Sequence, residues 1–110
     1  MLKDTIQQIE KAINKMDSVD GEDKAELLGL LEALKSELET LSETHQEHAQ
    51  SIASFTQLAA REALRRKKTP GLVKHSVDGL ALSAEGFEAS HPRLIEIVEA
   101  ICVMLARIGI

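Results

Sequence analysis

Three of the four histidines occupy positions from which their imidazole rings could meet. His45 and His48 are three residues apart, so on a helix they lie on one side, and His91 belongs to a later segment. Imidazole is a common ligand of zinc, copper and nickel, and two ligands on one helix with a third on its neighbour make a workable site. One hypothesis is therefore a transition-metal site made of His45, His48 and His91.

The same histidines also have interpretations that involve no ligand. A histidine on an apolar helix face is often a polar layer that sets helix register, or the cap of a helix. Because imidazole titrates near neutral pH, a pH-sensitive interface is a third interpretation. His75 lies outside the group and is expected at the surface. We expect a structural role, with metal binding as the alternative and no other cofactor.

A run of basic residues between positions 61 and 74 is the second candidate site, and Glu62 is its only acid. Clustered cations can hold a phosphate group, a nucleic acid backbone or an acidic protein surface. No aromatic residue interleaves with the run, so base stacking is not available, and a formal charge of −5 disfavours general affinity for nucleic acid. An anion site is the alternative here. It would use Arg61, Arg65, Arg66, Lys67 and Lys68.

Other catalytic chemistry is not indicated, and an enzyme is not expected. Cys102 is the only cysteine, which excludes an internal disulfide, and its neighbours Ile101 and Val103 suggest a buried, inert thiol. The sequence suggests no Ser-His-Asp or Cys-His arrangement and has no glycine-rich phosphate loop. The apolar run from Ala100 to Ala106 is shorter than the ~20 residues of a membrane span, so we expect a cytoplasmic protein without a membrane partner.

The elements that must position these residues are helices. Apolar residues make up 44% of the chain, yet Trp and Tyr are absent and Phe occurs twice, so the core must be aliphatic side chains at helical spacing. No stretch alternates as a strand would. We expect one all-α domain, 1–110, with a short N-terminal helix and an antiparallel hairpin or bundle. The expected helices are about 2–17, 21–42, 44–68, 70–90 and 92–108.

Two points along the chain leave alternatives open. Residues 22–68 could form one helix of about 70 Å, or break near 41–44, where Thr44 and Glu47 have the form of a capping box. The chain should reverse at Thr69-Pro70-Gly71, since proline favours the first position of a helix. Antiparallel spacing from that reversal would set His48 opposite His91, and Phe55 opposite Ala84.

Apolar residues recur at alternating spacings of four and three beyond residue 70, which is typical of a coiled-coil heptad. Such continuous stripes leave more apolar surface than one short chain easily covers. We therefore expect a non-catalytic interaction or structural module that forms a homo-oligomer, with a dimer favoured; a compact monomer is the alternative, and a protein partner is possible. The expected self-association residues are Val73, Val77, Leu80, Phe87, Leu94, Val98, Ile101 and Leu105.

The last third of the chain carries a family resemblance. The pattern includes Leu80, Ser83, Glu85, Phe87-Glu88, Ser90-His91-Pro92, Leu94, Val98, Ile101, Leu105 and the terminal Gly109-Ile110. It resembles a family of short bacterial proteins known as domain of unknown function, number four-four-zero-four, and the resemblance is best over residues 79–110. The resemblance implies a small helical bacterial protein. It implies no activity, cofactor or catalytic residue.

Overall fold

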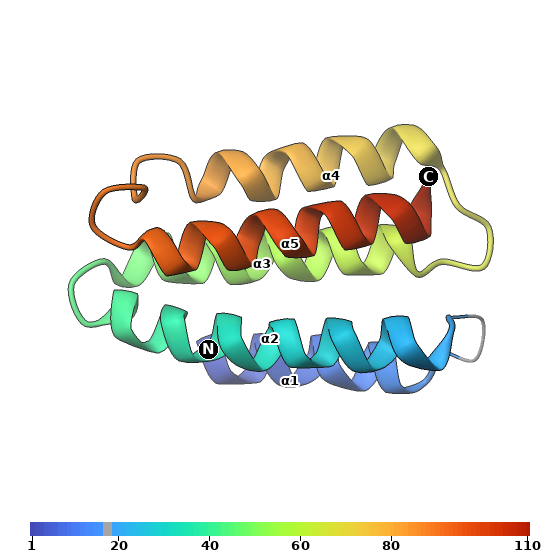
Figure 1. Ribbon diagram of the computed structural model, residues 1–110, viewed down its shortest axis with the longest axis horizontal. Helices are drawn as coiled ribbons and strands as arrows, with labels where there is room; N and C mark the ends of the chain where they lie inside the picture. The colour runs from blue at the N-terminus through green and yellow to red at the C-terminus, as the bar shows by residue number, and fades with distance from the viewer. Residues whose placement is uncertain (17–18) are drawn as a thin grey trace.

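The computed structural model describes residues 1–16 and 19–110, whose regular structure consists of α-helices without a strand (Figure 1). The all-α prediction is therefore confirmed. The helices are α1 (Leu2–Asn14), α2 (Gly21–Ser42), α3 (Gln46–Ala63), α4 (Pro70–Ser83) and α5 (Pro92–Gly109).

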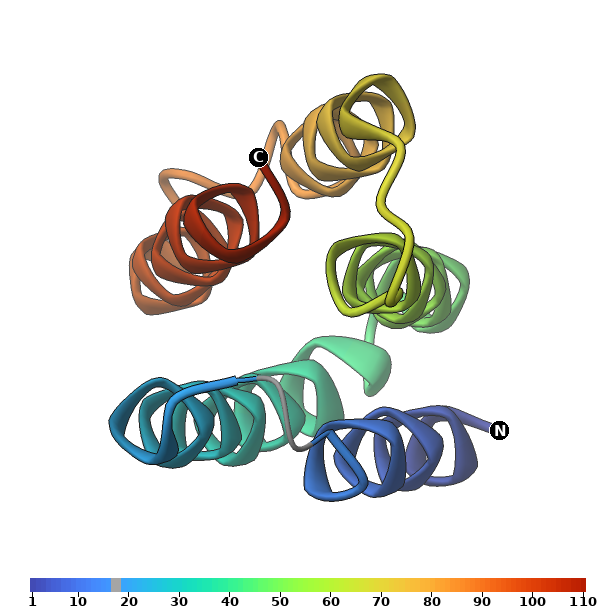
Figure 2. The same cartoon turned by 90° about the vertical axis from the view of Figure 1, so that its right-hand side faces the viewer.

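Helix α3 is the centre of the bundle and packs against all four other helices. Helices α1 and α2 form one layer below it, α4 lies on the other side, and α5 lies between α2 and α4 (Figures 1 and 2). The radius of gyration over Cα atoms is 12.9 Å, close to the roughly 13 Å expected for a compact domain of this length. The helices thus enclose one shared core.

The core is aliphatic, as the composition requires. Helix α1 buries Ile6, Ile9 and Ile13, which stand at the three-and-four spacing that lines one helix face. Helix α2 does the same with leucines, and each such side chain stabilises the fold by roughly 1.5–3 kcal/mol on transfer from water. The buried leucines are Leu27, Leu31, Leu34, Leu38 and Leu41.

The chain breaks between α2 and α3. Of the two alternatives for residues 22–68, the break near residues 41–44 is therefore correct and the single long helix is wrong. The backbone N–H of His45 donates to the carbonyl of Leu41 at 2.8 Å, which closes the last turn of α2. The proposed capping box is also wrong, because the N-cap of α3 is His45. The Thr44 hydroxyl instead donates back to the Leu41 carbonyl at 3.4 Å.

Several helices are shorter than the sequence pattern suggested. Helix α4 ends at Ser83 rather than near residue 90, because the chain turns at Gly86, whose φ is 104°, a value that glycine adopts without steric cost. The backbone N–H of Gly86 donates to Glu88 Oε2 at 2.8 Å within that turn. Helix α3 ends at Ala63 instead of residue 68. Helix α1 ends at Asn14, and residue 17, its expected end, lies outside the described residues.

The reversal between α3 and α4 is centred earlier than expected. It spans residues 64–69, since α3 ends at Ala63 and α4 begins at Pro70. Phe55 consequently packs on Gly79 rather than facing Ala84: a Cβ atom added to Gly79 would lie 2.7 Å from Phe55 Cε1. The antiparallel pairing itself is as predicted, with a register shifted by more than one turn (Figure 1).

The residues expected to mediate self-association lie inside the single chain. Val77 is half-buried, and the other members of the set, from Val73 to Leu105, are at most 8% exposed. Helices α2 and α3 cover the stripes of α4 and α5, so no second chain is needed to remove them from water. We expected these residues to form the interface between two chains, and in the structure they are instead buried within one. The homodimer stays a prediction, but it would have to use another surface.

Two glycines give opposite expectations for the same substitution. A Cβ on Gly109 would lie 2.9 Å from Ala63 Cα, a main-chain atom that cannot rotate away, so Gly109→Ala should lower the free energy of unfolding by about 1–3 kcal/mol. Gly29, in α2, has nothing within 4 Å, so Gly29→Ala should raise it by up to about 1 kcal/mol through helix propensity. Urea unfolding followed by circular dichroism measures both. An undiminished stability of Gly109→Ala would contradict the packing.

Candidate functional site

The three candidate histidines gather at one end of the bundle around the ring of Phe87. The centroid of that ring is 5.3 Å from His45, 5.4 Å from His48 and 5.8 Å from His91. Each imidazole stands nearly perpendicular to it, at interplanar angles of 78° to 81°, which is the edge-to-face geometry that aromatic pairs prefer. His48 and His91 are thus brought near each other, as predicted, because both pack against Phe87.

Two of these histidines hold equivalent positions in the backbone. His45 is the N-cap of α3, with φ −136° and ψ 62°, and His91 is the N-cap of α5, with φ −138° and ψ 63°. Each Nδ1 lies within hydrogen-bond distance of the preceding hydroxyl, 2.8 Å from Thr44 Oγ1 and 3.0 Å from Ser90 Oγ. His45 and His91 therefore occupy the N-cap positions of their helices, but neither side chain makes a capping hydrogen bond to the helix backbone.

The geometry does not form the metal site that the spacing suggested. Within residues 1–16 and 19–110, no three His, Cys, Asp or Glu side chains come together as a group that could hold a metal ion. Instead, the three imidazoles are arranged around the ring of Phe87, which packs against each of them. The cluster is a packing arrangement that closes the end of the core.

The basic run is brought to the opposite end of the bundle. Arg65, Arg66, Lys67 and Lys68 occupy the exposed connection between α3 and α4, while Arg61 is exposed on the last turn of α3. Arg65 pairs with the buried Glu62 at 3.1 Å. Lys68 lines a hollow of about 280 Å³ together with Asp20 and Asp23 at the start of α2. Arg65 and Lys68 thus lie close to carboxylates of the same chain, and the anion site stays a prediction.

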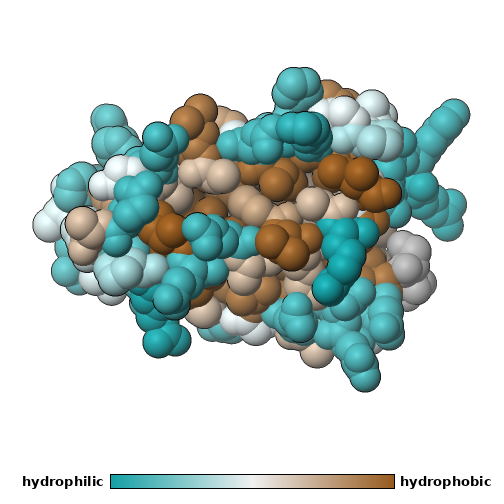
Figure 3. Space-filling model, turned by 45° about the horizontal axis from the view of Figure 1, so that its top comes forward, coloured by the Kyte–Doolittle hydropathy of each residue, from teal (hydrophilic) through white to brown (hydrophobic). Residues whose placement is uncertain are grey.

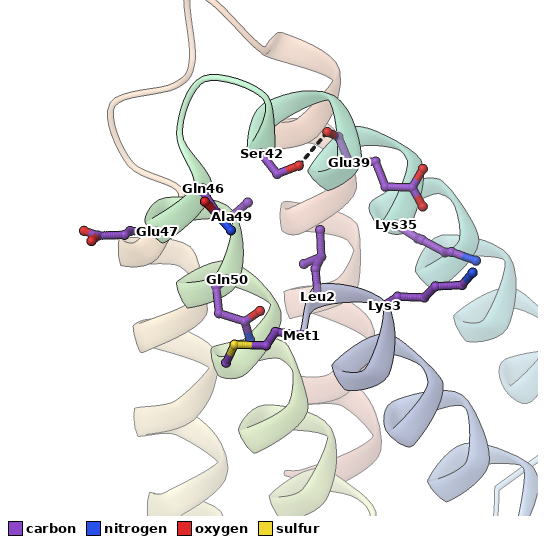
Figure 4. Close-up of a pocket in the computed structure, with 10 residues that line it drawn as sticks. All are labelled: Met1, Leu2, Lys3, Lys35, Glu39, Ser42, Gln46, Glu47, Ala49 and Gln50. Atoms are coloured by element: carbon purple, nitrogen blue, oxygen red, sulfur yellow. Dashed lines mark hydrogen bonds between the residues drawn. The ribbon is translucent and has the colours of Figure 1, made fainter.

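A hollow of about 880 Å³ opens where the start of α1 meets the end of α2 and the start of α3 (Figure 4). It exists because α1 has 13 residues and α2 has 22, so α2 extends beyond α1. In Figure 4 the amino groups of Lys3 and Lys35 lie near one another, and Glu47 points outward. Long, flexible side chains form much of its wall, which leaves few fixed groups to orient a ligand.

Cys102 lies half-buried between α5 and α4, where its Sγ is 3.6 Å from the carbonyl oxygen of Val77. Burial, together with the smaller effect of the negative charges of Asp78 and Glu99, raises the pKa of the thiol to about 11. A thiol with this pKa is almost wholly protonated at neutral pH, and the thiolate is the nucleophile. The expected inert cysteine agrees with this environment.

The outward side of α4 and α5 was not anticipated from the sequence. Leu82 is 68% exposed and Val103 is 66% exposed, beside two grooves that run along α5. We call this surface the α4–α5 face, and Figure 3 shows apolar side chains gathered along its middle with hydrophilic ones at the edges. The groove between α4 and α5 has a volume of about 330 Å³ and that between α2 and α5 about 460 Å³.

A signal for this face existed in the sequence. Leu82 and Val103 stand outside the alternating series that marks the core, so an apolar residue at either position has no place in the core stripe. Charged residues lie one helical turn away from both, Asp78 and Glu85 around Leu82 and Glu99 and Arg107 around Val103, which is typical of an exposed helix surface. Reading the residues left over from the core pattern would have located the face.

These features define an all-α bundle, with five helices in the part of the chain that the structure describes, in which the aliphatic core lies within one chain and the apolar α4–α5 face is exposed. The sequence profile of a family described as Domain of unknown function (DUF4404) matches residues 2–110. The chain belongs to this family, as its last third suggested. No curated protein and no solved structure matches the chain.

Among the described residues, none of the helices is both long and apolar enough to cross a bilayer.

The two phenylalanines provide a matched pair for testing the histidine cluster. Phe87 is buried against three imidazoles, so Phe87→Ala should lower the free energy of unfolding by about 3 kcal/mol or more. Phe55 is 38% exposed and packs on Gly79, so Phe55→Ala should cost less than half as much, about 1 kcal/mol. Urea unfolding measures both, and equal losses would contradict the central position of Phe87.

The raised pKa of Cys102 predicts slow alkylation of the folded chain. Against an ordinary value of 9.0, a pKa of about 11 leaves roughly 100-fold less thiolate at pH 8. Iodoacetamide should therefore label folded protein more slowly than urea-unfolded protein, by about 100-fold or more, as measured by mass spectrometry. Equal labelling rates would contradict this environment.

The same pKa shift makes the stability of the fold depend on pH. The folded chain holds the thiol proton more tightly than the unfolded chain, so this contribution to the free energy of unfolding is complete below pH 9.0 and is lost as pH rises towards about 11.

Proposed function

We propose that this chain is a non-catalytic interaction module that binds a protein partner through the α4–α5 face. The observation that supports the proposal is the exposure of Leu82 and Val103 next to two grooves on one side of the molecule. Exposed apolar side chains that gather beside grooves on one side of a domain are typical of interaction sites. A partner that buried these two side chains would gain roughly 1.5–3 kcal/mol from each.

The chemistry of the exposed groups favours binding over catalysis. Cys102 lies between α4 and α5, and burial together with Asp78 and Glu99 raises its pKa to about 11, which disfavours the reactive thiolate. The candidate histidines pack edge-to-face around Phe87 at an end of the bundle, where His45 and His91 occupy the N-cap positions of α3 and α5. Their rings are engaged in packing.

The expected homo-oligomer takes a changed form in this proposal. Residues such as Leu80 and Ile101 are fully buried, so a second copy could not contact them without opening the bundle. A second copy would have to use the outward side chains instead. The α4–α5 face is therefore the surface on which partner and self-association compete.

Site-specific photocrosslinking tests the proposal in cells that produce the chain. p-Benzoylphenylalanine placed at Leu82 or at Val103 should give discrete crosslinked adducts, because both side chains project from the face that a partner would cover. The matched control is the same residue at Gln7, which is exposed on α1, a helix that packs on α2 and α3. Denaturing electrophoresis and mass spectrometry read the adducts. Equal or absent adducts at Leu82, Val103 and Gln7 would contradict the proposal.

A further inference from the structure

Carboxylates surround the apolar floor of the groove between α4 and α5. The floor includes the buried Ala84 and Val98 with the partly buried Ile95, and Leu82 stands at its edge. The acidic residues lining this groove are Asp78, Glu85, Glu88 and Glu99. The groove between α2 and α5 adds Glu26 and Glu96, and Glu99 lines both. The face therefore combines an apolar strip with negative charge on both sides.

The cations at the edges of this face do not neutralise it. Lys74 Nζ is held by Asp78 at 2.9 Å, and Arg107 is held by Asp23 at 3.0 Å, so each cation is matched by a carboxylate. Glu85, Glu96 and Glu99 are exposed along the same face. The negative field extends between the helices, since Asp78 and Glu99 both contribute to the raised pKa of Cys102.

The dimensions suit a helix as the occupant. Helices α4 and α5 lie side by side, and α4 has 14 residues, about 21 Å of length at 1.5 Å per residue (Figure 1). A third helix laid in the groove between two packed helices places side chains at positions i, i+3, i+4 and i+7 along its floor. About four turns of such a helix would cover the apolar strip.

We infer that the partner of this face is a basic amphipathic helix, whose apolar side chains enter the α4–α5 groove and whose Lys and Arg residues meet Glu85, Glu88 and Glu99 on its edges. This inference rests on the proposed function and specifies the partner's chemistry. Opposite charges at the rim steer the encounter and exclude acidic helices, which would place like charges together.

A second copy of the chain fits the face less well. The densest cluster of its own cations lies at residues 61–68, where Arg65, Arg66, Lys67 and Lys68 occupy the connection after α3. That connection carries positive charge without an apolar helix stripe to enter the groove. The exposed charge and the required apolar face are therefore not combined in one segment of this chain.

A helical peptide library displayed on phage tests the inference. Each member has a fixed stripe of leucines at i, i+3, i+4 and i+7, and its flanking positions are randomised among Lys, Arg, Glu, Gln and Ser. Selection on the immobilised full chain should enrich Lys and Arg over Glu by about tenfold or more. The charge-reversed chain Glu85→Lys/Glu99→Lys should reverse this preference. Both positions are exposed, and an unchanged circular dichroism melting curve verifies the fold.

The matched control for the groove is Leu82→Ser/Val103→Ser, which keeps the charges and removes apolar contacts. This variant should capture about tenfold less of the enriched peptide pool than the unchanged chain does. Enrichment of Glu, or a Lys preference unchanged by charge reversal, would overturn the inference. So would an absence of enrichment while photocrosslinking at Leu82 still gives adducts, in which case the proposed function stands. If those adducts contain only a second copy of the chain, the inference fails too. Absence of both enrichment and adducts would overturn both.

Discussion

The close approach of four helices to α3 is the constraint on which the whole bundle depends. The buried face of α3 is built largely from alanines: Ala49, Ala53, Ala59, Ala60 and Ala63. Small side chains let neighbouring backbones come near, and the Gly109 of α5 packs directly on Ala63. The buried hydroxyl of Thr56 is satisfied within the helix, by donating to the Ile52 carbonyl at 2.8 Å. Larger residues on α3 would separate the α1–α2 layer from α4 and α5.

The connection between α4 and α5 links this core to the exposed surface. The turn at Gly86 directs Phe87 inward, where it closes the end of the core against three histidines. Glu85 and Glu88, on either side in sequence, line the α4–α5 groove. One short turn therefore positions both the buried ring of Phe87 and the two carboxylates at the edge of the groove. Its geometry depends on a glycine with positive φ.

Helices α3 and α5 begin with the same local structure, at the same end of the bundle. Helices α3 and α5 both begin after a hydroxyl residue followed by a histidine N-cap, with nearly the same backbone angles. Both histidines then pack on Phe87. Positions that suggest metal ligation in the sequence thus serve to begin two helices and seal the core between them.

The sequence by itself determined the helical class and the helix starts at residues 70 and 92, because apolar periodicity and proline chemistry act locally. It also indicated that His48 and His91 would come near each other. Only the tertiary structure decided that Phe87 stands between them, that the stripe from Val73 to Leu105 is covered within one chain, and that Leu82 and Val103 remain outside. The physical reason is that periodicity identifies a face to be buried, but which helix covers it depends on the lengths of turns and the angles between helices. Helix α4 ends at Ser83, and not at the expected residue 90, because a single turn at Gly86 redirects the chain. That turn sets the positions of the groove, the acidic rim and the histidine cluster.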